Sequence, residues 1–326
     1  MMRSPKYFAV ACRAPNKELV IQAEPIEKTW IGKQKWLKLP FLRGSWALLD
    51  SMTLGIRAMR FASNIQLAPE YQPVDAEAIA KVEELMDESG DTMPVTKEVV
   101  VQLEISTNKK IQEGLVYGAI IFSLAFGVFF FKVVPQAIGT FLEMKRGFSD
   151  RQTNTVVEFI KAFFFLGYLY AISFAPSVKE VFRYHGAEHK AINTWEADEE
   201  LTMENCQKQT RLHPRCGTSF AIIVLLLGFV VYSQLPRVGK GTYLGELFGN
   251  VGLHLLILPL IAGVAYELLR FAGKYRHNKA IMVLFLPGLW TQYITTAEPR
   301  DDQIEVALAS LKACLDGEDT LKEVKV

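Results

Sequence analysis

Three of the five histidines and two of the four cysteines lie in one polar stretch, residues 182–220, between long apolar runs. Within this stretch, His185, Glu188 and His189 form the pattern H-x-x-E-H. On a helix, His185 and His189 lie one turn apart on the same face, with Glu188 beside them. This spacing lets two imidazoles bind one metal ion while a carboxylate stays close to the ion's remaining position, where it could act as a general base.

A second pair of candidate ligands, His213 and Cys216, follows in a turn that contains Pro214 and ends at Gly217. Nitrogen and sulfur ligands in two close pairs are typical of a divalent-metal site, with zinc as the first choice. If all four side chains bind, they fill the coordination sphere of the ion, and the site is structural. If three bind, one position stays open for catalysis. The alternative without a metal is a helix cap and a tight turn held by hydrogen bonds.

Three further charged residues could support such a site. Glu196 lies on the same helical face as His189, where it would be a ligand or a partner that fixes an imidazole tautomer. Arg215, inside the second pair, could face an anionic lipid headgroup or a substrate carboxylate. Glu267 lies in an apolar run, and an intramembrane carboxylate is a functional candidate. A salt bridge from Glu267 to Arg270 is the structural alternative.

The composition favours a membrane protein. Half of the 326 residues are hydrophobic, and they are gathered into long runs. The net charge of +1 gives no reason to expect nucleic-acid binding, and four cysteines are too few for a disulfide framework in a chain of this length. Four runs are close to the length that crosses a bilayer: 114–134, 155–175, 218–235 and 247–269. Residues 280–289 are apolar but form a run too short to cross a bilayer. They are either a re-entrant segment or a buried strand or helix.

The predicted fold is therefore a mostly α integral membrane protein with about four transmembrane helices and a small α+β cytoplasmic lobe built from both termini. A β-hairpin is expected around residues 14–17, and a strand at 292–296 followed by a helix near the other end. The expected organisation is a hairpin in 1–39, an amphipathic interfacial helix in 40–64, an acidic linker or insertion in 65–110, spans and the His/Cys-rich loop in 111–291, and the strand and helix in 292–326. The alternative for 40–64 is an ordinary amphipathic helix on a soluble domain.

Lysines and arginines near the runs predict the orientation. They are most numerous before the first run, in the 182–220 loop and after the last run. This bias places both termini and the His-rich loop on the cytoplasmic side of the inner (plasma) membrane of a multi-pass protein. A reducing cytoplasm suits Cys216 as a thiolate ligand. The expected partners are the lipid bilayer and, as further candidates, other membrane proteins.

The motifs HGAEHK, LTMEN and HPRCGTSF resemble the YqhQ-like family of bacterial membrane proteins. Further matches run from one end of the chain to the other: MMRSP, YELLR, PGLWTQYITTAEP and QIEVALASL. That family is built around a domain of unknown function and has been labelled a predicted metal-dependent enzyme. The resemblance thus implies membrane character and a metal, without a substrate. Members carry a Gly-rich stretch such as GGQAVIEGV before MMRSP, which implies an additional first strand upstream.

Three functions follow from these patterns. The first is a membrane-bound, metal-dependent hydrolase of a peptide or lipid-linked substrate, with Glu188 as the general base. The second is a non-catalytic membrane scaffold with a structural metal or none. The third is a transporter component. The sequence gives this function the least support, because it contains no paired broken helices.

Overall fold

The computed structural model describes residues 1–26, 42–71, 109–275 and 278–323. The chain divides into two compact units, each described here by itself. The terminal unit comprises Met1–Ile26, Thr53–Leu124 and Ala309–Val326. The helical unit comprises Glu27–Met52 and Ala125–Leu308. Most of the acidic linker or insertion expected at 65–110 lies outside the described residues.

The terminal unit contains a three-stranded antiparallel sheet in the order β1-β2-β3, formed by β1 (Met2–Arg3), β2 (Tyr7–Arg13) and β3 (Leu19–Pro25). β2 and β3 pair from Tyr7 opposite Pro25 to Arg13 opposite Leu19. The connecting turn is closed by a hydrogen bond of 2.9 Å from the Lys17 amide to the Ala14 carbonyl, and Lys17 has a φ of 72°. The hairpin expected from the sequence is present.

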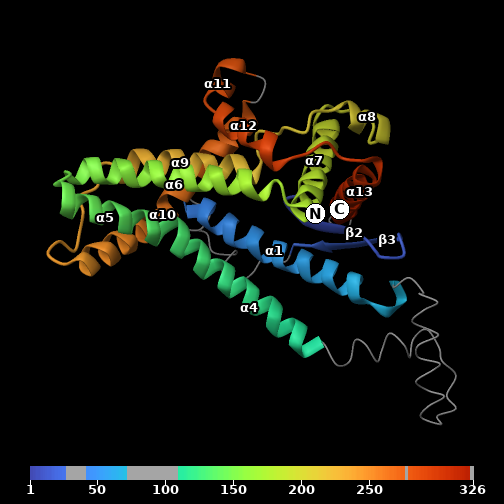
Figure 1. Ribbon diagram of the computed structural model, residues 1–326. Coiled ribbons are helices and arrows are strands. Elements are labelled where there is room, and N and C mark those ends of the chain that lie inside the picture. The colour runs from blue at the N-terminus through green and yellow to red at the C-terminus, as the bar shows by residue number, and fades with distance from the viewer. Residues whose placement is uncertain (27–41, 72–108, 276–277, 324–326) are drawn as a thin grey trace, which may run out of the picture. The chain divides into compact units, whose positions relative to one another are not determined.

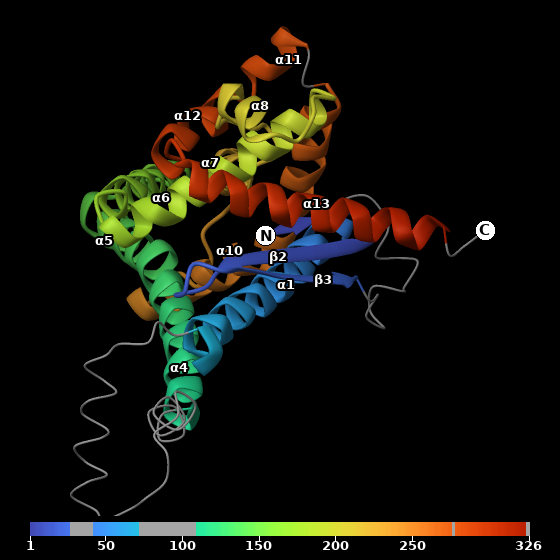
Figure 2. The ribbon, with the colours of Figure 1, turned by 90° about the vertical axis from the view of Figure 1, so that its right-hand side faces the viewer.

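Both ends of the chain contribute to this unit. The carboxy-terminal part of α13 (Asp301–Glu323) meets β2, where Ser310 Oγ donates to the Ala9 carbonyl at 3.0 Å (Figure 2). Near the end of α13, a Cβ added to Gly317 would lie 2.2 Å from the ring of Tyr7, so the ring rests directly on the helix backbone. The second half of α1 (Leu42–Leu67) adds apolar side chains to a cluster centred on Phe8 and Leu54.

The helical unit continues from α4 (Lys109–Val128) through a short π-helix, η4 (Phe129–Val133), into α5 (Val134–Arg146). Its other helices are α6 (Asp150–Ile172), α7 (Pro176–Glu196), α8 (Met203–Lys208), α9 (Gly217–Tyr232), α10 (Tyr243–Lys274), α11 (Lys279–Val283) and α12 (Leu286–Thr295). In the terminal unit, a 3-10 turn (Pro69–Tyr71) follows α1. α5 packs on α6, and α9 packs on α6, α10 and α12. α6 and α9 run side by side in Figure 1.

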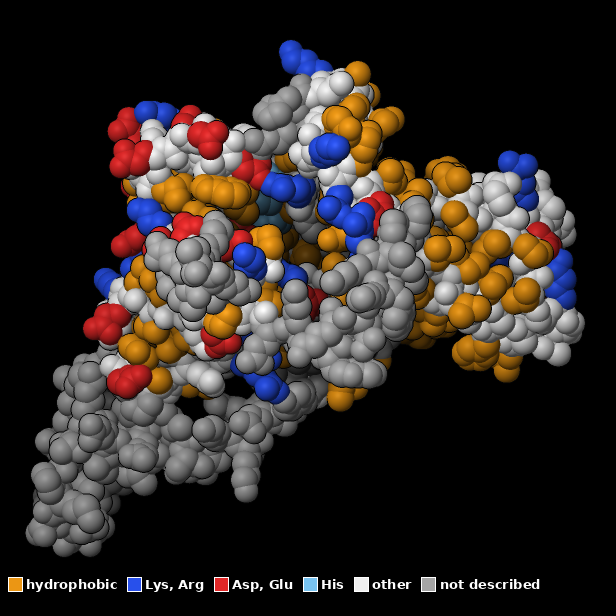
Figure 3. Space-filling model, turned by 180° about the vertical axis from the view of Figure 1, so that it is seen from behind, with side chains coloured by type: hydrophobic (Ala, Val, Ile, Leu, Met, Phe, Trp, Pro, Cys, Tyr) orange, Lys and Arg blue, Asp and Glu red, His pale blue; other side chains and the backbone are white. Residues whose placement is uncertain are grey.

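Three helical stretches in the described residues are long and apolar enough to cross a membrane: Ile121–Arg146, Asp150–Ile172 and Tyr243–Lys274. α9 is apolar but shorter, with 16 residues. Apolar side chains cover much of the surface of these helices (Figure 3). Among those most exposed are Phe141, Phe159, Phe163, Leu256 and Leu260. Such a surface suits a lipid environment, and the count of four spans stays a prediction.

The strand expected at 292–296 is wrong, because these residues mostly belong to helix α12. Their composition is rich in β-formers, but the buried positions are Gly288, Thr291, Gln292 and Thr295, which is helical spacing. Gly288 lets α12 approach α9 closely, since a Cβ there would lie 3.0 Å from the Ser219 side chain. Tertiary packing therefore overrides local propensity. The apolar run at 280–289 is likewise helical, in α11 and the start of α12.

Candidate metal centre

The H-x-x-E-H motif lies on a helix, as the spacing predicts. α7 begins at Pro176, which suits the first helical turn because its missing N–H would have no partner there. His185 and His189 lie on one face of α7, and their ring centroids are 4.4 Å apart. His189 is buried and His185 is half-buried.

The chain returns to this face of α7 after α8. Lys190 Nζ donates to the Gln207 carbonyl at 2.9 Å, and Asn193 Nδ2 donates to the Thr210 carbonyl at 2.8 Å. These contacts lead the segment after α8 back along α7, so that the turn before α9 meets the two histidines. Cys216 is the N-cap residue of α9, at the end of this turn.

Three side chains converge at this point. One possible ligand atom from each of His185, His189 and Cys216 lies within 4.8 Å of the other two. The Sγ atom of Cys216 is 3.2 Å from Nε2 of His185. Two imidazoles and one thiol at this separation match the donor types and the spread that a tetrahedral divalent ion takes from three protein ligands.

Hydrogen bonds at the far side of each ring orient the two histidines. Nδ1 of His185 is 2.9 Å from the Thr295 carbonyl, and Nδ1 of His189 is 2.6 Å from the Arg211 carbonyl. A carbonyl only accepts hydrogen bonds, so each Nδ1 carries the proton and Nε2 remains available as the ligand atom. This arrangement is the usual second layer around metal-binding histidines.

His213 does not join the three. Its ring is near that of His189, with centroids 5.8 Å apart, but both of its nitrogens have other partners. Nδ1 accepts from the Arg215 backbone N–H at 3.3 Å, which leaves Nε2 to donate to Glu196 Oε2, also at 3.3 Å. Glu196 thus fixes the tautomer of His213, one of the two roles expected for it. Arg215 pairs with the other oxygen of the same carboxylate.

The pKa values follow from this geometry. Burial acts to raise the pKa of the Cys216 thiol, but hydrogen bonds and positive charge from His185 and His189 lower it to about 5. Burial acts to lower the pKa of His185, but the hydrogen bond to Cys216 and its negative charge raise it to about 9. Burial lowers the pKa of His213 to about 4, so that ring is neutral at pH 7. Without a metal, Cys216 and His185 therefore form a thiolate–imidazolium pair.

Glu188 lies half-buried on α7 beside the three candidate ligands. Its negative charge acts to raise the pKa of both His185 and His213, although burial is the largest influence on each. Among the described residues, no donor is hydrogen-bonded to its carboxylate. The carboxylate is therefore available to accept a proton.

Two residues that hold the site were not singled out from the sequence. The Gln292 amide binds the backbone of His213 on both sides: Oε1 accepts from its N–H and Nε2 donates to its carbonyl, each at 2.8 Å. Gly186 lets the segment after α12 approach α7, because a Cβ there would lie 2.2 Å from the Ala297 carbonyl oxygen. Two features of the sequence could have pointed to these residues. One is a lone amide side chain in the apolar segment of α12, and the other is a glycine inside a helical motif.

Glu267 contacts a different part of the chain from the candidate ligands. Its carboxylate accepts from two nitrogens of Arg43, with Nε 2.6 Å from Oε1. The partner expected from the sequence was Arg270, so that prediction missed a contact between segments far apart in the chain. The hydrogen bond to Glu267 is the main reason that the pKa of Arg43 is raised. This pair is structural, and Glu267 is not part of the candidate metal centre.

Comparison with known proteins supports the resemblance. The chain is 32% identical over 280 residues to the uncharacterized protein YqhQ of Bacillus subtilis (strain 168), a match that covers 85% of this chain and 77% of that protein. No solved structure matches. Residues 39–317 match a family described as a protein of unknown function, DUF1385. From these matches over most of its length, the chain belongs to the DUF1385 family.

Proposed function

We propose that this protein is a membrane-embedded, metal-dependent hydrolase. Its divalent ion, zinc first, is held by His185, His189 and Cys216, and Glu188 is the general base. The observation that carries the proposal is the convergence of three ligand atoms within 4.8 Å, with a free carboxylate on the same helix. Three protein ligands leave one position open, which is the arrangement of catalytic rather than structural zinc sites.

The donor set fits such an ion. Both imidazoles have Nδ1 bonded to a carbonyl, Nε2 of His185 faces the thiol, and the thiol is a thiolate at neutral pH. A bound divalent ion supplies Lewis acidity and brings the pKa of a water molecule down to ~7. Glu188 accepts the proton of the attacking water and returns it to the leaving group. Burial keeps His213 neutral, and Glu196, which is paired with Arg215, fixes the tautomer of His213 beside these groups.

The substrate class follows from the position of the site. Cys216 caps the apolar helix α9, so the candidate ligands lie at the end of a membrane-facing helix. A peptide or a lipid-linked substrate that reaches the membrane surface is therefore the class proposed. The Lys and Arg bias supports the cytoplasmic face of the plasma membrane, four spans with α9 as the short one, and cytoplasmic termini.

A non-catalytic scaffold with a structural metal is the second candidate, and one specific observation supports it. The ring of His213 lies 5.8 Å from that of His189, close enough for a side-chain rotation to bring it in as a fourth ligand. A closed site of four ligands would stabilise the loop and perform no chemistry. A transporter role has no comparable support in the described residues.

The test uses the full chain, purified without chelators and reconstituted in lipid nanodiscs. Zinc content is measured by mass spectrometry, and hydrolysis is measured with a library of quenched fluorescent peptides and with acyl-linked peptides. Glu188→Gln is expected to keep one zinc per chain and to lower hydrolysis by roughly 10²–10⁴-fold. Glu199→Gln, an exposed carboxylate beyond the end of α7, is the control and is expected to change neither.

The outcomes separate the candidates. Zinc with hydrolysis that depends on Glu188 supports the proposal. Zinc without hydrolysis of either substrate class supports the scaffold. A zinc content near zero in the wild type would exclude the metal site. The motif would then be a structural turn held by hydrogen bonds.

A further inference from the structure

The candidate spans contain ionisable side chains that the metal centre does not use. Lys132 lies in the π-helical turn η4, and Glu158 and Lys161 lie one turn apart on α6. His254 lies on α10 and is buried. Charged side chains at this depth in a membrane are costly and are usually paired or functional. The partners of these four side chains therefore show whether any of them remains available to bind a ligand.

Lys161 is fully satisfied. Its Nζ is 2.5 Å from Glu158 Oε1 and 2.9 Å from Nδ1 of His254, which must accept because an ammonium only donates. Gln136 Nε2 is 3.2 Å from the same Nδ1. The pair of Glu158 and Lys161 is thus extended across three helices, α5, α6 and α10.

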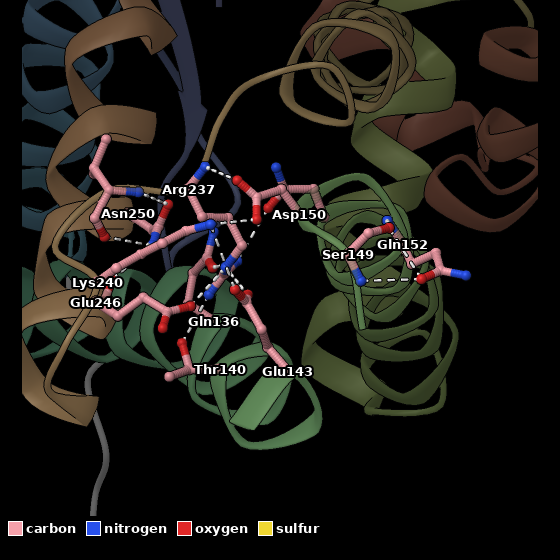
Figure 4. Close-up of polar contacts among 12 residues, drawn as sticks. Gln136, Thr140, Glu143, Ser149, Asp150, Gln152, Arg237, Lys240, Glu246 and Asn250 are labelled. Atoms are coloured by element: carbon pink, nitrogen blue, oxygen red, sulfur yellow. Dashed lines mark hydrogen bonds and ion pairs between the residues drawn. The ribbon is translucent and has the colours of Figure 1, made fainter. Parts of the chain in front are cut away.

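A second polar cluster lies next to it, around Arg237, as Figure 4 shows. Arg237 Nε lies 2.7 Å from Glu246 and 2.5 Å from Glu143. Lys240 Nζ lies 2.6 Å from Asp150. Gln136 joins the two clusters, because its Oε1 accepts from Arg237 at 3.1 Å. Arg237 therefore serves two carboxylates, Glu143 and Glu246, and Lys240 pairs with the third, Asp150.

Lys132 is different. Its Nζ lies 5.3 Å from the centre of the Tyr232 ring, and Lys161 Nζ lies 5.1 Å from the same centre. A cation near an aromatic ring gains only a modest stabilisation. Among the described residues, no carboxylate lies within ion-pair distance of Lys132. Lys132, Lys161 and Glu158 together carry a local surplus of one positive charge, although the cluster around Arg237 holds one more carboxylate than cations.

This surplus charge borders a cavity of about 380 Å³ between the helices. Its wall includes Lys132, Glu158, Lys161 and Tyr232. The rest of the wall is apolar, and includes Phe131, Phe165, Phe220, Val224, Leu225 and Leu258. From Phe220 to Tyr232 the wall follows α9 for about 18 Å, at 1.5 Å per residue. The cavity is thus elongated and apolar, and its wall includes the ammonium group of Lys132, which forms no ion pair among the described residues.

We propose that this cavity binds a long-chain carboxylate, such as a free fatty acid, with its chain along α9 and its carboxylate on Lys132. The volume lies at the small end of the range of ligand sites, which suits one chain rather than two. A single negative charge balances the surplus, whereas a phosphomonoester would carry more. The phenol of Tyr232 already donates to the His254 carbonyl at 2.9 Å and does not compete for Lys132. This inference does not rest on the metal centre.

The test uses the full chain in phosphatidylcholine nanodiscs and a fatty acid that carries a diazirine near the end of its chain. After illumination, the labelled residues are mapped by mass spectrometry, with and without excess unlabelled fatty acid. Labelling that the competitor removes is expected at Val224, Leu225 and Leu258. Lys132→Met should lower it by about tenfold to a hundredfold, the value of a charge-assisted hydrogen bond.

Lys145→Met removes an exposed lysine from the end of α5 and is the matched control, which should label like the wild type. Ala262→Phe fills the cavity from α10 and is a second variant that leaves Lys132 in place. It should also abolish the competed labelling. The same diazirine on a long-chain alcohol and on a lysophospholipid tests the headgroup.

Equal labelling by the alcohol, or labelling that persists in Lys132→Met, would show an apolar groove filled by any lipid chain and would overturn the proposal. Stronger labelling by the lysophospholipid would replace the carboxylate by a phosphodiester and would also overturn it. Labelling spread over lipid-facing residues such as Phe163 would show that the cavity holds no ligand.

Discussion

The Nε2 atom of His185 lies 3.2 Å from the Sγ atom of Cys216, a contact between residues 31 positions apart in the chain. His185 comes from the middle of α7, and Cys216 caps the start of α9. The contact unites the H-x-x-E-H motif with the H-x-x-C motif. It also makes the metal-free site a charged pair, which has measurable consequences.

The thiol of Cys216 is expected to titrate far below its ordinary value. Its pKa in the folded chain is about 5, against 9.0 for an unperturbed thiol. Because the folded value is the lower one, the contribution of Cys216 to the free energy of unfolding is fully present above pH 9 and is lost as the pH falls through 5. After chelation, the ultraviolet difference spectrum between the wild type and Cys216→Ser should show a thiolate at pH 7. A thiolate signal that appears only above pH 8 would contradict this prediction.

The number of ligands can be tested by removing one imidazole at a time. His189→Ala should release the zinc, whereas His213→Ala should retain it, because both nitrogens of His213 are engaged by Arg215 and Glu196. Replacement of zinc by cobalt gives a visible spectrum that reports the coordination. Added azide should change that spectrum if one position is open. Loss of metal in His213→Ala, with no response to azide, would instead indicate the closed site of four ligands.

Gly186 should be intolerant of a side chain. Gly186→Ala places a Cβ 2.2 Å from the Ala297 carbonyl oxygen, so the segment that carries the Thr295 carbonyl must move away from His185. The expected cost is about 1–3 kcal/mol of stability, with weaker zinc binding. Gly167→Ala on α6 is the control, because nothing lies within 4 Å of the added atom. Thermal unfolding and zinc titration of both variants give the comparison. Equal behaviour of the two would show that the close approach is unimportant.

The orientation of the chain is the last prediction. Reporter fusions after Val326 and in the loop near Glu200 should both give a cytoplasmic signal, because the Lys and Arg bias places these segments on the positive side. A fusion near Lys240, in the connection between α9 and α10, should report the opposite side. A periplasmic signal at either of the first two points would refute the proposed topology.

Several features were determined by the sequence alone, because they depend on near neighbours in the chain. The spacing of His185 and His189 needs only a helix to bring the rings together, and α7 supplies it. The long apolar runs are helices in the structure, since their length and composition suffice for that prediction.

Other features were decided by tertiary contacts that no local pattern contains. Residues 292–295 are helical because α12 packs on α9, although their composition favours a strand. Glu267 binds Arg43, which is far away in the chain, and His213 is held by Glu196 and Gln292. A side chain with several possible partners takes the one that packing brings within reach. Periodicity predicts the face on which a residue lies, but only the folded chain selects its contact.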